Sequence, residues 1–264
     1  MKLGFIGCGN MTQSMIKGII YNEILIPEDI VASDAYKEGL EMTSAMYGIC
    51  TAETNIEVVE KSDVIFLAVK PYLYEKVAEE IKAYLKPHHI VVTIAPGKTL
   101  EWLAQQLGEN TKIVRTMPNT PSMVGEGMTG LCHNELVTNE EISEICRIMR
   151  GFGRVEIVPE YLMDVVVAVS SSSPAYVFMF IEAMADAASA DGMTRDQAYQ
   201  FAAQAVYGSA KMILETHKHP GQLKDMVCQP GGTTLEAIRV LESHKLRSSI
   251  FEAMKACVVH AKKM

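Results

Sequence analysis

A glycine-rich turn followed by two hydroxyl side chains lies near the end of the chain, at Pro230-Gly231-Gly232-Thr233-Thr234. Pro230 interrupts a helix-rich region, and the residues after Thr234 have the composition of a new helix. A helix that begins at glycine leaves backbone N–H groups without partners, and the backbone can approach a ligand closely there. This turn is therefore suited to bind a small anion such as a carboxylate.

A second glycine motif, Gly7-Cys8-Gly9, lies near the start of the chain between an apolar run and an amphipathic segment. In dinucleotide-binding proteins the first glycine of such a motif forms the tight turn, and the second admits the pyrophosphate. Thr12 stands at the third glycine position of the motif, and the alternative interpretation is an ordinary strand-to-helix turn. We expect a dinucleotide to contact the residues of this turn, namely Gly7, Cys8, Gly9, Asn10 and Met11.

Asp34 follows the next apolar run and bears on which dinucleotide would bind. A carboxylate there accepts hydrogen bonds from ribose hydroxyls, which favours NAD over a phosphorylated ribose. Ser33 and Lys37 favour NADP weakly, and Asp34 could instead cap a helix. We expect NADPH or NADH to serve as the cofactor, with a slight preference for NADH.

Short apolar runs alternate with helical patterns from Lys2 to about Val158. Predicted buried strands are Leu3–Ile6, Ile30–Ala32, Val64–Val69, Ile90–Ile94 and Ile113–Thr116. Predicted helices are Asn10–Tyr21, Tyr36–Tyr47, Asn55–Glu60, Tyr72–Leu85 and Thr99–Leu107. This alternation predicts an α/β fold with a parallel, doubly wound, Rossmann-like sheet. Because such sheets bind ligands at the carboxyl ends of their strands, further cofactor-binding residues are expected at Ala68, Val69, Lys70, Pro71, Ala95 and Gly97.

Strand patterns disappear after Glu160, and the rest of the chain is predicted to be helical. We expect a dinucleotide-binding domain over residues 1–159 and an all-helical domain over 160–264. Ser173 with Pro174 favours a helix start, and Gly192 favours a helix end before a new start at Thr194.

The helices expected over Ala175–Ala190 and Ala198–Leu214 are apolar around much of their circumference, which predicts a subunit interface. The uncharged stretch Val165–Ile181 contains serines and a proline and is short for a bilayer span, so we expect a buried helix and no membrane contact.

Composition narrows the possible partners and the cellular compartment. The net charge of −8 and the pI near 5.4 argue against binding to nucleic acid. Six cysteines without a Cys-x-x-Cys pair favour reduced thiols, and the first residues do not have the pattern of a signal peptide. His217 and His219 have no thiol or carboxylate cluster beside them, so no metal site is expected. A cytoplasmic protein is the expectation.

Several motifs in this order resemble the pyrroline-5-carboxylate reductase family over nearly the whole chain. They are Gly4-Phe5-Ile6-Gly7-Cys8-Gly9-Asn10-Met11, Ala68-Val69-Lys70-Pro71, Arg115-Thr116-Met117-Pro118-Asn119-Thr120-Pro121, Ser173-Pro174-Ala175-Tyr176, His219-Pro220-Gly221-Gln222-Leu223-Lys224-Asp225 and Pro230-Gly231-Gly232-Thr233-Thr234. The resemblance implies reduction of a cyclic imino acid, 1-pyrroline-5-carboxylate, to L-proline by hydride transfer from NAD(P)H, the last step of proline biosynthesis. It also implies a homodimer formed by interlocking C-terminal helices, with dimers assembled into larger rings.

The same resemblance implies roles for particular residues. The substrate carboxylate would lie on the turn formed by Gly231, Gly232, Thr233 and Thr234, with the Thr234 hydroxyl at the ring nitrogen, and Asn55 would lie near the adenosine. The chain departs from the family pattern near the substrate: serines stand where glycines are usual, and a glutamine stands where serine is usual. The positions are Ser171, Ser173 and Gln229.

Reduction of a C=N bond requires a hydride donor at the carbon and a proton at the nitrogen. A cyclic imine can arrive already protonated, so no dedicated acid is needed. None of the seven histidines lies in the two motifs nearest the expected substrate. Thr234 is therefore expected to orient the substrate, with water as the final proton source. Placement of the reactants could supply on the order of 7 to 11 kcal/mol.

Two other functions are alternatives for this sequence. A hydroxyacid dehydrogenase of the same two-domain plan would use a helix lysine as acid with an asparagine one turn later, but Lys211 is followed at that spacing by Glu215. A nucleotide-binding regulator without catalytic activity would explain the departures at the serines and the glutamine. Ser170–Ser173 lacks the Gly-x-Ser-x-Gly pattern of a nucleophile, so helix capping is preferred there.

Overall fold

An eight-stranded sheet forms the centre of the first of two compact units. The computed structural model describes residues 1–263. The first unit comprises Met1–Ser172 together with the residues from Cys257 onward, and the second comprises Ser173–Ala256.

The strand order of the sheet is β3-β2-β1-β4-β5-β6-β7-β8. All pairs are parallel except β6 with β7, so the sheet is mixed. Strands β1, β2, β4 and β5 are buried on both faces, which explains their continuous apolar sequences. The strands are β1 (Leu3–Ile6), β2 (Ile30–Ser33), β3 (Cys50–Thr51), β4 (Val64–Leu67), β5 (Ile90–Thr93), β6 (Lys112–Met117), β7 (Gly127–His133) and β8 (Gly153–Ile157).

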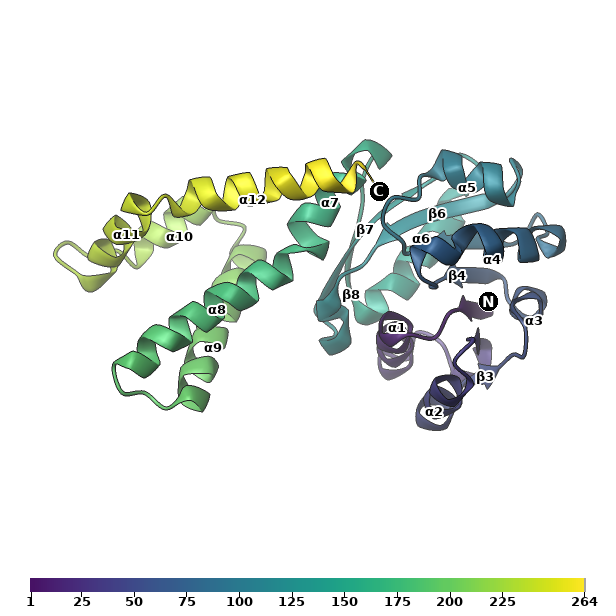
Figure 1. Ribbon diagram of the computed structural model, residues 1–264, viewed down its shortest axis with the longest axis horizontal. Coiled ribbons are helices and arrows are strands. Elements are labelled where there is room, and N and C mark those ends of the chain that lie inside the picture. The colour runs from purple at the N-terminus through teal and green to yellow at the C-terminus, as the bar shows by residue number, and fades with distance from the viewer. Residues whose placement is uncertain (264) are drawn as a thin grey trace. The chain divides into compact units, whose positions relative to one another are not determined.

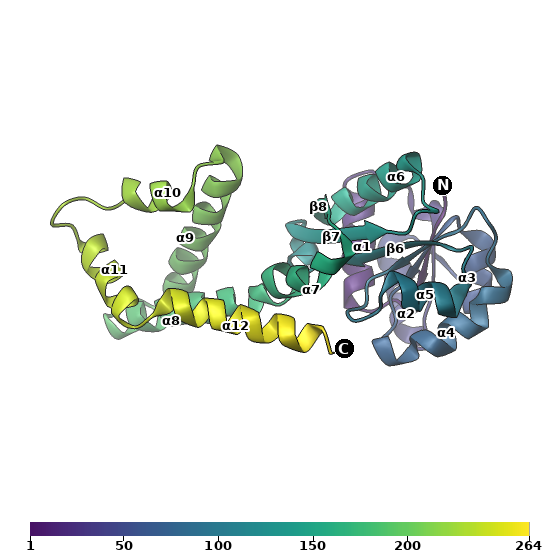
Figure 2. The same cartoon turned by 90° about the horizontal axis from the view of Figure 1, so that it is seen from above.

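Helices cover both faces of this sheet (Figures 1 and 2). Alternate side chains of β1 divide between two cores: Leu3 and Phe5 face the core that contains α1, α2 and α6, and Ile6 faces the core that contains α3, α4 and α5. The helices are α1 (Asn10–Tyr21), α2 (Lys37–Tyr47), α3 (Asn55–Lys61), α4 (Tyr74–Ile81), α5 (Leu100–Leu107) and α6 (Asn139–Met149). Short 3₁₀ turns are η1 (Pro27–Asp29), η2 (Pro71–Leu73), η3 (Lys82–Tyr84), η4 (Thr120–Val124), η5 (Arg150–Phe152) and η6 (Glu160–Leu162).

The expected doubly wound, Rossmann-like sheet is confirmed, with all five predicted strands in place. Its last part differs from the all-parallel prediction, because the chain returns through η4 and pairs β7 antiparallel to β6. A return this short cannot make the long crossover that a parallel pair needs. The helix expected over 72–85 is α4 with a 3₁₀ turn at each end, and Pro71 begins the first of these turns.

The second unit is entirely helical, as expected. Gly192 turns the chain with φ +96°, and Thr194 is the N-cap of the next helix. Helices α8 and α9 pack against each other as a hairpin (Figure 1). The helices from residue 163 onward are α7 (Met163–Val166), a π-helical turn η7 (Val167–Ser171), α8 (Ser173–Ala190), α9 (Arg195–Thr216), α10 (Pro220–Met226), α11 (Thr233–Ser243) and α12 (Leu246–Ala261).

Residues 160–172 and the end of α12 pack with the first unit. There Met163, Val167 and Ala261 form a small core with Met117 and Cys132. The domain boundary expected near Pro159 remains a prediction, and the packing places these thirteen residues with the sheet.

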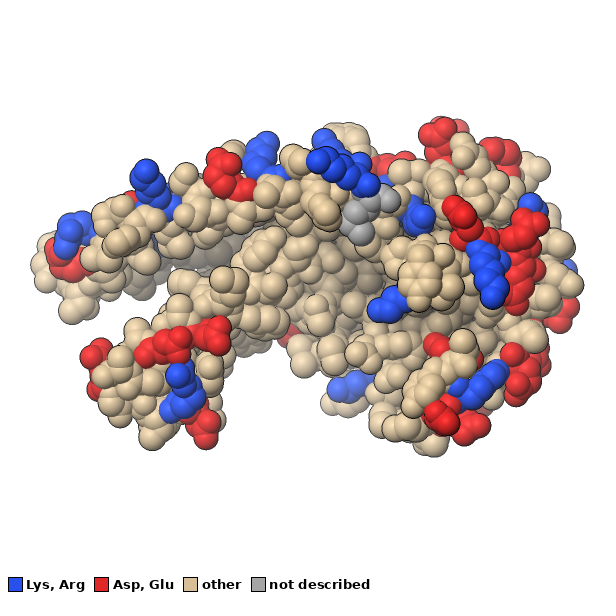
Figure 3. Space-filling view, in the orientation of Figure 1, with Lys and Arg blue, Asp and Glu red and all other residues tan. Residues whose placement is uncertain are grey.

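Only Val167 and Ala168 of the stretch Val165–Ile181 are buried within the single chain, so the expectation of a buried helix there is wrong at this level. Helix α8, which contains the second half of this stretch, is largely exposed. Ala185 is its only buried residue, whereas Phe178 is 63% exposed and Met179 is 69% exposed. Much of the visible surface of the second unit carries no charged side chain (Figure 3). The run Glu160–Ala190 is long and apolar enough to cross a membrane, a test that the core helix of a soluble protein also passes. Exposed apolar surface of this extent indicates an interaction surface.

Candidate functional site

A cleft of about 800 Å³ lies at the carboxyl ends of β1, β2, β4 and β5, where a doubly wound sheet binds its ligand. Eleven of the residues expected at the cofactor line it: Gly7, Gly9, Asn10, Met11, Asp34, Asn55, Ala68, Val69, Lys70, Pro71 and Ala95. Three that were expected are not in the lining, namely Cys8, Ser33 and Gly97. Lining residues that the sequence interpretation missed are Thr12, Ala35, Leu73, Lys76, Val77, Glu80, Ile94 and Pro96.

The turn between β1 and α1 has the geometry that its two glycines require. Gly7 has φ +101°, and a Cβ there would lie 2.8 Å from the carbonyl carbon of Ala68. Gly9 has no atom within 4 Å of the place where its Cβ would be. Gly9 is the N-cap of α1 and has no side chain that could cap the helix. The first backbone N–H groups of α1 therefore have no partner within the helix. Open space beside uncapped N–H groups fits a pyrophosphate.

Thr12 fills the third glycine position of the motif without disturbing the turn. Its hydroxyl donates to the Gly7 carbonyl oxygen at 2.8 Å, and its side chain is 1% exposed. The turn therefore accommodates a threonine, because the threonine hydroxyl donates a hydrogen bond to a buried carbonyl oxygen.

Asp34 connects the glycine turn to the segment after β2. Its Oδ2 accepts from the Cys8 N–H at 2.5 Å, and its Oδ1 accepts from the Tyr36 N–H at 2.8 Å. It does not cap α2, whose N-cap is Tyr36. The Cys8 side chain turns into the core, where burial raises the pKa of its thiol, so only the backbone of Cys8 belongs to the site.

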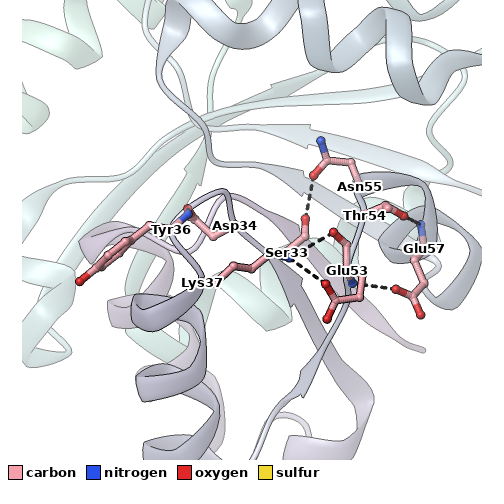
Figure 4. Close-up of polar contacts among 8 residues, drawn as sticks. All are labelled: Ser33, Asp34, Tyr36, Lys37, Glu53, Thr54, Asn55 and Glu57. Atoms are coloured by element: carbon pink, nitrogen blue, oxygen red, sulfur yellow. Dashed lines mark hydrogen bonds and ion pairs between the residues drawn. The ribbon is translucent and has the colours of Figure 1, made fainter.

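Ser33 and Asn55 form a hydrogen-bonded chain beside Asp34 (Figure 4). The Ser33 hydroxyl donates to Asn55 Oδ1 at 2.8 Å, and Asn55 Nδ2 donates to Glu80 Oε2 at 2.8 Å. Ser33 itself is buried, which explains its absence from the lining. Glu80 comes from α4, so no local motif around Asn55 could have pointed to it.

Lys37 points away from this chain and toward Glu53 (Figure 4). Its Nζ lies 3.3 Å from Glu53 Oε2 and 3.2 Å from the Glu53 carbonyl oxygen. The Glu53 N–H donates in turn to Glu57 Oε2 at 2.7 Å. The hydrogen bond with Lys61 lowers the pKa of Glu57, so this carboxylate stays charged.

Tyr74 connects β4 and β5, the two strands whose ends form the other end of the cleft. Its hydroxyl donates to the Leu67 carbonyl oxygen at 2.5 Å and accepts from Thr93 Oγ1 at 2.9 Å. Burial raises its pKa to about 12, so it stays neutral. It fixes the ends of β4 and β5, from which Ala68–Pro71 and Ala95 reach the cleft.

The Pro-Gly-Gly turn of the second unit has an open backbone. Gly231 has φ +73° and nothing within 4 Å of an added Cβ. Gly232 is the N-cap of α11 and makes no side-chain cap, and its N–H donates to the Gln229 carbonyl oxygen at 3.0 Å. Thr233 is exposed and Thr234 is half-buried. The first-turn N–H groups of α11 can therefore donate to an anion.

Asn119, from the Met-Pro-Asn-Thr-Pro motif, holds the serine-rich π-helical turn against the sheet. Its Nδ2 donates to the Ser170 carbonyl oxygen at 3.0 Å, and its Oδ1 accepts from the Met128 N–H at 2.8 Å. Ser171 ends this turn and Ser173 begins α8. Among residues 1–263 no group of histidine, cysteine and carboxylate side chains is placed to hold a metal ion.

Comparison with known proteins shows similarity over the whole chain. The family model "Pyrroline-5-carboxylate reductase dimerisation" matches residues 160–264, and the model "NADP oxidoreductase coenzyme F420-dependent" matches residues 2–97. Pyrroline-5-carboxylate reductase from Escherichia coli strain K12 is 50% identical over 263 residues, which cover 100% of this chain and 98% of that protein.

Solved structures show the same similarity. A pyrroline-5-carboxylate reductase from Coxiella burnetii superposes with a TM-score of 0.93 at 38% identity, covering 99% of this chain and 97% of that one. The Plasmodium falciparum pyrroline carboxylate reductase, solved with NADP bound, gives a TM-score of 0.90 at 30% identity, covering 100% and 97%.

Proposed function

Since the chain belongs to the pyrroline-5-carboxylate reductase family, we propose that it reduces 1-pyrroline-5-carboxylate to L-proline as an NAD(P)H-dependent enzyme, the last step of proline biosynthesis. The observation that carries this function is the full-length similarity together with a cleft that fits a dinucleotide. Small cyclic imino acids are its substrate class.

The residues of the cleft divide into three groups. Gly7, Gly9 and the first N–H groups of α1 hold the pyrophosphate, which the open space at Gly9 supports. Asp34 and Asn55 face the adenosine ribose, and Lys70, Pro71 and Ala95 line the nicotinamide end. Bound NAD(P)H supplies the hydride that adds to the imine carbon.

The substrate carboxylate binds the turn formed by Gly231, Gly232, Thr233 and Thr234. The uncapped start of α11 supports this assignment, because its N–H groups and helix dipole favour an anion. The Thr234 hydroxyl orients the ring nitrogen, and because the imine arrives protonated, this hydroxyl does not transfer the proton. Thr234 is the one catalytic residue we assign, and its role is placement.

The protein is a homo-oligomer, because residues 160–264 match the dimerisation region of the family. The exposed apolar side chains of α8 and α9 supply the surface that such an interface needs. We place dimers in a larger ring and the enzyme in the cytoplasm. All six cysteines are free thiols, which supports a reducing compartment.

The test is NAD(P)H oxidation by the purified chain with 1-pyrroline-5-carboxylate, compared with 2-oxo acids under the same conditions. Rapid oxidation with the imine alone supports the proposal. Oxidation with the oxo acids alone would indicate a hydroxyacid dehydrogenase, and dinucleotide binding without oxidation would indicate a regulator.

A further inference from the structure

The end of the cleft where a doubly wound fold places the adenosine ribose carries two carboxylates, those of Asp34 and Glu80. Two backbone N–H groups fix Asp34 in place. The side-chain amide of Asn55 donates to the Glu80 carboxylate at 2.8 Å. This hydrogen bond fixes the negative charge of Glu80 at this end of the cleft.

Ser33 and Lys37, two residues that could attract a 2′-phosphate, are engaged elsewhere. The hydroxyl of Ser33 is buried and donates to Asn55. Lys37, the basic residue that begins α2, is held by the side chain and the carbonyl oxygen of Glu53 and does not line the cleft. Lys76 does line it, but Glu80 follows it by four residues on α4 and lines the cleft as well, so this helix brings one charge of each sign to the cleft.

We propose that this arrangement makes the chain select NADH over NADPH, with Asp34 and Glu80 as the discriminating residues and Glu53 withholding Lys37. The inference rests on the proposed function and names the cofactor of that same site. A ribose hydroxyl can donate to Asp34, whereas a 2′-phosphate replaces that hydroxyl and brings between one and two negative charges at neutral pH. Because the phosphate would carry the same sign of charge as the two carboxylates, this end of the cleft disfavours the phosphorylated cofactor.

The test measures equilibrium binding of NADH and NADPH to the full chain by calorimetry, without substrate, so the result does not depend on turnover. We expect NADH to bind at least about tenfold more tightly. Asp34→Asn keeps an acceptor oxygen for the Cys8 N–H but removes the charge. It should bring the two dissociation constants to within about threefold of each other, mainly through tighter NADPH binding.

Release of Lys37 gives a second, independent test. Glu53→Gln should tighten NADPH binding severalfold with no effect on NADH, and Lys37→Met in that background should cancel the gain. Glu79→Gln is the matched control, because Glu79 pairs with Lys82 on α4 and does not line the cleft. Its ratio of dissociation constants should equal that of the native chain.

Tighter binding of NADPH by the native chain, lost in Lys76→Met, would overturn the inference, as would an unchanged ratio in Asp34→Asn. Rapid imine reduction with NADPH as the better-bound cofactor would overturn the inference alone. NADH-selective binding without imine reduction would support the inference and contradict the proposed function.

Discussion

At the scale of single residues, the proposed reaction depends on very few side chains. In the proposed site only the Thr234 side chain would lie at the reacting nitrogen, and backbone N–H groups at the start of α11, which no side chain caps, would bind the carboxylate. In the cleft the glycines and the uncapped start of α1 are again backbone features. Substitutions should therefore act mainly through geometry, and the effect of adding one methyl group should differ sharply between neighbouring positions.

Replacing Thr234 with alanine should lower kcat about 100-fold while leaving the dissociation constant for NADH unchanged. This expectation follows from the proposed role of the hydroxyl, which would orient the substrate without contacting the cofactor. Steady-state kinetics and calorimetry measure the two quantities, and Thr234→Ser should recover most of the turnover. Equal losses of turnover and of NADH affinity would refute the assignment.

Gly7→Ala and Gly9→Ala form a matched pair in the same turn. Gly7→Ala should destabilise the first unit by about 1 to 3 kcal/mol, because φ is +101° and the added Cβ meets the backbone of Ala68. Gly9→Ala should leave stability unchanged, because the added Cβ has open space, and should weaken NADH binding by about tenfold or more. Urea unfolding followed by fluorescence of the single tryptophan, Trp102, measures stability. Similar stability losses in both variants would contradict this account of the turn.

The sequence predicted much of the cleft lining, because strand ends and glycine turns are local signals. It placed Cys8 and Ser33 in the lining, although the side chains of both are buried. It missed Lys76, Val77 and Glu80, because they reach the cleft from one face of a helix that the local sequence does not assign to any site.

At the scale of elements, the cleft depends on strand ends that are held in register by buried polar groups. The helices and central strands were predictable because their apolar spacing is strong. Strand β7 was not predictable, because it contains two glycines and ends at a half-buried histidine. Strand β8 was not predictable either, because it is exposed along much of its length. Helix α6 has clear amphipathic spacing and a capping box at Thr138, so this helix could have been predicted.

His89, the residue that precedes β5, is a pH-sensitive group. It is 3% exposed, and its Nδ1 accepts from the Lys86 N–H at 3.1 Å, which requires the neutral ring. Burial, reinforced by the charges of His88 and Lys86, lowers its pKa to about 4. Because the pKa is lower in the folded state than its unfolded value of about 6.5, its stabilising effect is complete above that pH and is lost toward pH 4.

We expect the free energy of unfolding to decrease as pH falls from about 6.5 to about 4, and His89→Gln to reduce that decrease. Urea unfolding at a series of pH values checks this. His88→Gln changes an exposed neighbour and should retain most of the dependence. An identical pH profile for His89→Gln and the native chain would show that His89 is not responsible.

At the scale of the whole molecule, the apolar helices of the second unit require a partner chain. The sequence predicted this interface, because α8 and α9 are apolar around most of their circumference. The expectation of a buried helix over Val165–Ile181 is wrong within the single chain, because apolar spacing indicates how much surface must be covered and does not indicate which chain covers it.

Phe178→Asp should raise the dimer dissociation constant by about 100-fold or more, because it places a charge on a surface that association buries. Analytical ultracentrifugation over a micromolar concentration range measures the change. Met42→Glu is the control, since Met42 is 66% exposed on α2 of the first unit. A native chain that stays monomeric at these concentrations would contradict the assembly.

The most direct test of the account is the fate of the hydride. The chain should be incubated with 1-pyrroline-5-carboxylate and NADH deuterated at the transferable position of the nicotinamide, and the product analysed by mass spectrometry and NMR. The account predicts L-proline with one deuterium at C5, formed in equal amount to the NAD⁺ produced. NADH oxidation without proline, or proline without deuterium at C5, would contradict it.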